Sequence, residues 1–82
     1  MERLTQKIET GYIVADPIQA VNKLGRLEDM YEALCEEKQK IERDMKQLSD
    51  SGKTKTVTYK QLFANKLTVI NLLSRFEVYG NE

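Results

Sequence analysis

Histidine and tryptophan are absent from this 82-residue sequence, and cysteine occurs once, as Cys35. The absence of histidine removes the common zinc sites and every catalytic arrangement that needs an imidazole base. Because a single cysteine cannot form an intramolecular disulfide and has no histidine to activate it, we expect Cys35 to pack as a small apolar side chain in a reducing cytoplasm. We therefore predict a protein that is not an enzyme, with no catalytic residue, no metal site and no cofactor.

A long apolar run and a net charge are also missing. No run approaches the roughly 20 residues that span a bilayer, and no hydrophobic region follows the first five residues, so neither a membrane span nor a signal peptide is expected. Thirteen basic residues balance thirteen acidic ones, which counts against a nucleic-acid binder because such binding depends on neutralising phosphates. The balance is uneven: residues 1–50 hold 8 basic and 11 acidic groups, a net charge of −3, whereas residues 51–82 hold 5 and 2, a net charge of +3.

One proline and four glycines leave little to interrupt helices. Asp16-Pro17 is a helix start signal, because aspartate caps free backbone amides and proline suits the first helical position. A first helix is therefore predicted over residues 17–49, with Gly25 marking close packing or a kink. Its seam positions, all but one of them apolar or aromatic, recur at spacings of three and four, which predicts packing against another helix. These positions are Leu24, Leu27, Tyr31, Leu34, Lys38, Ile41, Met45 and Leu48.

Residues 1–16 have β-strand character. The alternation over residues 4–8 and the β-prone run of residues 12–14 predict a β-hairpin of residues 3–8 with residues 12–15, turning at Glu9-Thr10-Gly11. Two strands alone are marginal in water. The arm therefore either covers the end of the helices or adds a strand to a partner, and the sequence leaves open whether it pairs within or between chains.

Residues 50–58 are predicted to form a turn, in which Gly52 ends the first helix in a left-handed conformation. Gly52-Lys53-Thr54 invites comparison with a phosphate-binding loop. The comparison fails because the first glycine of that motif would fall at Gln47 and no strand precedes it. The lysines of this region could still form a basic tip for phosphates or an acidic protein surface, although a solvated turn explains them as well.

A second helix is predicted over residues 59–79. Thr58 and Gln61 have the spacing of a capping box, Val57 with Leu62 has the spacing of a hydrophobic staple, and Gly80-Asn81 supplies the stop. The apolar side chains of this helix occupy an arc of about 200°, which is roughly twice what one antiparallel neighbour covers.

The chain is therefore predicted to be mainly α, a single domain over residues 1–82 built as a long antiparallel helical hairpin with a short N-terminal β-hairpin or extended arm. If Leu48 lies opposite Tyr59, then Tyr31 lies opposite Phe76, and Lys38 and Lys66 occupy positions in the packed seam, where they help to fix its register. Because the second helix has apolar surface to spare, we expect a two-fold dimer that forms a four-helix bundle, or a heterologous partner on the same face.

Two sets of residues are candidates for binding. Nine are expected to form the oligomer or partner interface: Tyr31, Leu34, Leu62, Phe63, Leu67, Val69, Ile70, Leu73 and Phe76. Five are candidates for contact with an anion or a partner: Lys53, Lys55, Tyr59, Lys60 and Arg75.

Two stretches in the first third of the chain carry a resemblance to known proteins: Met1-Glu2-Arg3-Leu4-Thr5, followed by Gly11, and later Leu24-Gly25-Arg26-Leu27-Glu28-Asp29. With these residues the chain resembles small accessory proteins of phages and prophages of Gram-positive bacteria. No functional residue can be carried over from that family. What the resemblance implies is a setting, the cytoplasm of a bacterial host cell, where small non-enzymatic proteins often inhibit host machinery or defence systems.

The leading hypothesis is a phage-type interaction protein that binds a host macromolecule and modulates it, most simply by inhibition; a defence system such as a CRISPR effector is a specific version. One alternative is an oligomer that sequesters a nucleotide signal through Lys53, Lys55, Lys60, Tyr59 or Arg75. Another is a small nucleic-acid-binding accessory protein.

Overall fold

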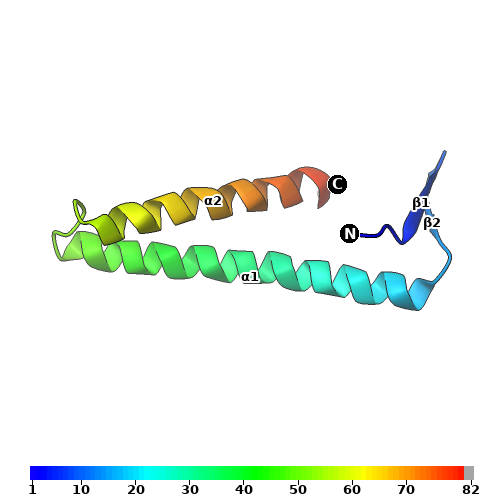
Figure 1. Ribbon diagram of the computed structural model, residues 1–82, viewed down its shortest axis with the longest axis horizontal. Helices are drawn as coiled ribbons and strands as arrows, with labels where there is room; N and C mark the ends of the chain where they lie inside the picture. Colours follow the sequence, from blue (N-terminus) through cyan, green and yellow to red (C-terminus); the bar gives the residue numbers. More distant parts are fainter. Residues whose placement is uncertain (81–82) are drawn as a thin grey trace. The chain divides into compact units, whose positions relative to one another are not determined.

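The computed structural model describes residues 1–80, and within them the chain is mainly helical, as predicted. The elements follow the order β1 (Thr5–Ile8), β2 (Gly11–Val14), α1 (Pro17–Asp50) and α2 (Val57–Gly80) (Figure 1). The contacts divide the chain into two units, of which the first is Met1–Met30 and the second begins at Tyr31, so that α1 belongs to both. No helix within residues 1–80 is long and apolar enough to cross a bilayer.

The N-terminal unit contains the predicted β-hairpin, with a first strand two residues shorter than expected and a second strand that begins and ends one residue earlier. β1 and β2 pair antiparallel within the chain, with Thr5 opposite Val14 and Ile8 opposite Gly11. Gly11 has a φ of +147°, which a residue with a side chain rarely adopts, so the glycine of the predicted turn is required by the backbone.

Polar contacts hold this arm within its unit. The Arg3 guanidinium lies 5.7 Å from the centre of the Tyr12 ring, and its Nε donates a 2.9 Å hydrogen bond to the carbonyl of Thr5. The ammonium group of Lys23 on α1 donates to the carbonyl of Glu2. These contacts join the arm to the start of α1, while the strand side chains remain largely exposed.

The start of α1 follows the sequence prediction. The backbone N–H of Gln19 donates a 3.1 Å hydrogen bond to Oδ1 of Asp16, which is therefore the N-cap, and Pro17 is the first helical residue. The helix continues through Gly25, where an added Cβ would meet no atom within 4 Å, so the prediction of close packing at Gly25 is wrong.

The end of α1 lies one residue beyond the predicted boundary and is closed by Gly52, whose φ is +72°. The N–H of Lys53 donates to the carbonyl of Leu48 at 2.7 Å, and the N–H of Gly52 donates to the carbonyl of Ser49 at 3.0 Å. This pair of bonds is a Schellman motif, which satisfies two carbonyls that the helix end would otherwise leave unpaired. The predicted left-handed glycine is confirmed.

The start of α2 differs from the prediction. Thr56, and not Thr58, is the N-cap, because its Oγ1 accepts a 3.2 Å hydrogen bond from the N–H of Tyr59. The same hydroxyl donates to the carbonyl of Lys53 at 2.8 Å, which ties the cap to the preceding turn. The helix therefore begins at Val57, whose side chain is 83% exposed, so the predicted hydrophobic staple does not form.

The core lies between the C-terminal part of α1 and α2, which run antiparallel side by side (Figure 1). The Tyr31 and Phe76 rings, whose centres are 5.8 Å apart, confirm the predicted pairing of these positions. Among residues 1–80, five side chains are buried: Leu34, Ile41, Met45, Val69 and Leu73. Five others are half-buried around them: Tyr31, Cys35, Tyr59, Leu62 and Phe76. The core is thin, since no side chain within residues 1–80 is more than 98% buried.

Candidate protein-binding face

Helix α2 carries two parallel series of residues at heptad spacing, displaced from each other by one position. The first, which we call the inner seam, is buried or half-buried along its whole length. Its members are Tyr59, Leu62, Lys66, Val69, Leu73 and Phe76. Five of these six residues belong to the core against α1 or pack beside it, so the inner seam is the face that folds the chain.

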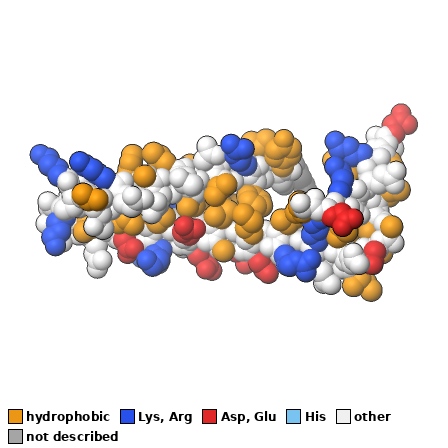
Figure 2. Space-filling view, in the orientation of Figure 1, with side chains coloured by type: hydrophobic (Ala, Val, Ile, Leu, Met, Phe, Trp, Pro, Cys, Tyr) orange, Lys and Arg blue, Asp and Glu red, His pale blue; other side chains and the backbone are white. Residues whose placement is uncertain are grey.

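The second series, which we call the outer seam, begins one residue later and has the same spacing of three and four. Its members are Lys60, Phe63, Leu67, Ile70, Ser74 and Glu77. Phe63 is 50% exposed and Leu67 is 53% exposed, whereas Ile70 is half-buried. A one-residue displacement turns a helix face by about 100°. The outer seam therefore points away from α1 and leaves apolar side chains at the surface of α2 (Figure 2).

The nine predicted interface residues separate into two groups in the structure. Six of them lie in the core between α1 and α2 or beside it: Tyr31, Leu34, Leu62, Val69, Leu73 and Phe76. Phe63, Leu67 and Ile70 remain outside this core and form the apolar centre of the outer seam. Sequence reasoning missed the polar members Ser74 and Glu77, and it named Lys60 as a candidate for anion or partner contact without placing it on this face. The signal that finds them is the second heptad series.

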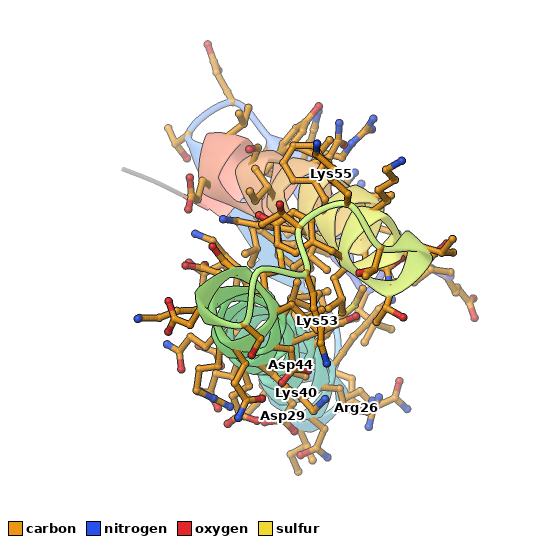
Figure 3. All side chains as sticks on the ribbon, turned by 90° about the vertical axis from the view of Figure 1, so that its left-hand side faces the viewer. Arg26, Asp29, Lys40, Asp44, Lys53 and Lys55 are labelled. Atoms are coloured by element: carbon orange, nitrogen blue, oxygen red, sulfur yellow. The ribbon has the colours of Figure 1, made fainter. Side chains whose placement is uncertain are left out.

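The five predicted anion contacts do not come together in one place. Lys53 and Lys55 lie on different sides of the turn (Figure 3), and Tyr59 packs beside the core. Arg75 donates a 2.9 Å hydrogen bond from Nε to Oδ1 of Asn71, and it lies about 22 Å further along α2 than Lys60 at 1.5 Å per residue. Gly52 follows a helix, not the strand that precedes a phosphate-binding loop.

The charged side chains on the surface of α1 pair largely with one another. Lys40 pairs with Asp44 and Lys46 pairs with Asp50, each at 3.1 Å and one helical turn apart. A shallow, open depression on this surface is lined by Arg43, Asp44, Lys46, Gln47 and Asp50, all from α1. Exposed ion pairs of this kind contribute little to the stability of the fold, so this charged face of α1 is a solvated surface.

Tyr31 is a titratable group whose pKa the fold changes. The neighbouring Cys35 raises the pKa of Tyr31 through its charge and a hydrogen bond, with smaller contributions from burial and from Glu77. A phenol with a raised pKa stays protonated at neutral pH, so it cannot act as a base there. Its ring against Phe76 is part of the packing between the helices.

Among residues 1–80, no three His, Cys, Asp or Glu side chains are grouped closely enough to hold a metal ion. Comparison with protein-family models, curated proteins and solved structures finds no match to this chain. The feature with the clearest functional content is therefore the outer seam, which is an ordered, partly apolar helix face that the α1–α2 core does not use.

Proposed function

We propose that this chain is a non-catalytic interaction protein, in which the outer seam of α2 binds another polypeptide. The observation that carries this proposal is the second heptad series, with Phe63 and Leu67 half-exposed beside a helix face that is already packed. Heptad spacing is the pattern by which helices pack on helices. A contiguous apolar strip at a protein surface marks an interaction site more often than an isolated exposed residue does.

The inner seam supports this proposal because it holds α2 in place before any partner arrives. Val69 and Leu73, which are buried against α1, alternate along the helix with Leu67 and Ile70 of the outer seam. A face that is already ordered loses less conformational entropy on binding than a flexible segment does.

The resemblance of the first third to phage accessory proteins supplies the setting for the proposal. In that setting the protein binds a host macromolecule and inhibits it, and a defence complex such as a CRISPR effector is the specific version. The separation of Lys53 from Lys55 at the turn, and of Arg75 from Lys60 along α2, favours this protein–protein function over a nucleotide-sequestering one. A phosphate site needs cations that converge on one point.

Photo-crosslinking tests the binding face. A photoreactive amino acid is placed at Leu67, on the outer seam, or at the adjacent Thr68, which is also exposed but lies about 100° away around the helix. We expect the Leu67 variant to form a covalent adduct with a polypeptide in the bacterial cell and the Thr68 variant to form far less. Equal yields from the two positions, or no adduct from Leu67, would contradict the proposal.

The inhibitory role needs its own assay. A phage sensitive to the defence system is plated on host cells that carry the system and express the protein, and plaques are counted. We expect the wild-type protein to raise the plaque count, Leu67→Glu to abolish the rise and Thr68→Glu to retain it. If the wild-type protein changes no defence phenotype, the defence version is wrong, whereas the crosslinking result still decides the binding face.

A further inference from the structure

We infer that the polypeptide on the outer seam is the outer seam of a second copy of this chain, with the two α2 helices antiparallel about a two-fold axis. The inference rests on the proposed function, because it names the occupant of that binding face. In a two-fold interface, each residue i that contacts residue j of the partner is matched by residue j contacting residue i of the partner. An outer seam that binds a second outer seam must therefore place chemically complementary residues opposite each other.

The apolar residues at the centre of the outer seam face apolar residues of the second copy when the two-fold axis crosses α2 midway along the seam. This point lies halfway between Asn65 and Leu72. In that register Leu67 faces Ile70 of the second copy, so branched apolar side chains meet at the centre. Phe63 faces Ser74 of the second copy, so the largest side chain of the seam meets the smallest. Alternation of large and small residues across facing positions is what allows helix layers to interdigitate without voids.

Ser74 does not oppose burial in this arrangement. Its Oγ donates a 2.9 Å hydrogen bond to the carbonyl of Ile70 within α2. A hydroxyl that already has a partner can be covered by an aromatic ring without leaving an unsatisfied donor, which is the cost that usually keeps serine out of apolar interfaces.

The charges at the two ends select the antiparallel direction. Lys60 at one end of the seam faces Glu77 of the second copy, and the symmetry repeats this opposite-charge contact at the other end. Neither residue takes part in the ion pairs found among the described residues. A parallel pairing would instead place Lys60 against Lys60 and Glu77 against Glu77, and a shift by one heptad would place a charge against Leu67 or Ile70.

The angle between the two seams also fits this assembly. A displacement of one residue separates the faces by about 100°, which is close to the right angle between the two neighbours of a helix at the corner of a four-helix bundle. α2 can therefore pack on α1 through the inner seam and on the second copy's α2 through the outer seam. This is the two-fold four-helix arrangement that the wide apolar arc of the sequence favours.

Charge reversal in the purified full-length protein, measured by sedimentation equilibrium over a range of concentrations, tests the inference. We expect wild type to dimerise. Because Lys60→Glu or Glu77→Lys alone places like charges together at both ends of the interface, we expect each to weaken dimerisation by about 5- to 30-fold, the equivalent of roughly 1–2 kcal/mol over two exposed contacts. The double variant Lys60→Glu/Glu77→Lys exchanges the charges and should restore dimerisation to near the wild-type level. Arg75→Glu, which makes the same change of charge at an exposed position outside the seam, should have little effect.

Far-UV circular dichroism of each variant checks that the helices are retained, which is expected because Lys60 and Glu77 are exposed. A wild-type protein that stays monomeric at 100 µM, or a double variant no better than the singles, would overturn the inference. If the protein is monomeric while the photoreactive group at Leu67 captures a different polypeptide, the self-association is wrong and the proposed binding face stands. If Leu67 captures nothing and the protein is monomeric, both are wrong.

Discussion

Leu72 and Leu73 are adjacent on α2, and their different environments give a sharp test of which face folds the chain. Leu73 is 7% exposed and belongs to the core with Leu34 and Val69, whereas Leu72 is 37% exposed. Replacing each leucine by alanine removes the same atoms from the same helix. The intrinsic helix propensity therefore changes equally in the two variants, and the difference in stability reports burial alone.

The magnitude follows from the thinness of the core. Leu→Ala at a buried position generally costs about 2–5 kcal/mol, from the lost burial of the side chain and from the cavity that remains. Only two helices line the site, so neighbours can relax towards a vacated position, and we expect Leu73→Ala to cost about 2–3 kcal/mol. Leu72→Ala leaves no enclosed cavity and gains the better helix former, so we expect a loss below about 1 kcal/mol.

Urea unfolding followed by far-UV circular dichroism, at one fixed protein concentration for all variants, measures both values. A fixed concentration matters because self-association would make the apparent stability depend on it. For a chain of this size a loss of 2–3 kcal/mol lowers the melting temperature by about 8–24 °C. If the two variants lose equal stability, or if Leu72→Ala loses more, then the inner seam is not the face that packs against α1. The assignment of the outer seam is then wrong as well.

Three further outcomes are expected. Gly52→Ala should destabilise the chain by about 1–2 kcal/mol in the same urea assay, because alanine is strained at a φ of +72°; an unchanged midpoint would refute the left-handed cap. Asp16→Ala should cost about 1 kcal/mol by removing the acceptor for the N–H of Gln19, whereas Asp16→Asn should retain most of the stability; equal losses in the two variants would refute the cap. Because the folded-state pKa of Tyr31 is raised from 10.0, its contribution to stability is present below pH 10 and is lost as the pH rises through the folded-state value. The urea midpoint should therefore fall as the pH rises above 10 in wild type and fall less in Tyr31→Phe, while an identical fall in both would refute the shift.

The sequence predicts the helices well because their signals are local. Asp16-Pro17 and Gly52 act through backbone geometry within a few residues, and the structure places both where the pattern indicates. The start of α2 was misassigned because Thr56 and Thr58 are both suitable caps. Local pattern cannot separate them, since the choice depends on the turn bringing the carbonyl of Lys53 to the hydroxyl of Thr56.

The binding face is only half predictable from the sequence. The arc of about 200° on α2 indicates that two neighbours are needed, and the Tyr31–Phe76 pairing follows from the heptad register. The arc does not show which of its residues pack against α1. That division is set by the length and handedness of the turn, so Phe63 and Val69 stand together as interface candidates in the sequence although only Val69 is in the core.

The two seams of α2 also explain what the C-terminal part of α1 contributes to binding. Most of the stability of a helix in a protein comes from the packing of its apolar face, and α2 has a single alanine to favour the helix on its own. A partner that bound an unfolded α2 would have to supply the free energy for ordering it. Packing of Leu34, Ile41 and Met45 against the inner seam supplies that free energy within the chain, before association. The outer seam is then ordered before a partner binds. Substitutions along it should alter assembly while leaving helix content unchanged. Substitutions along the inner seam should alter both assembly and helix content.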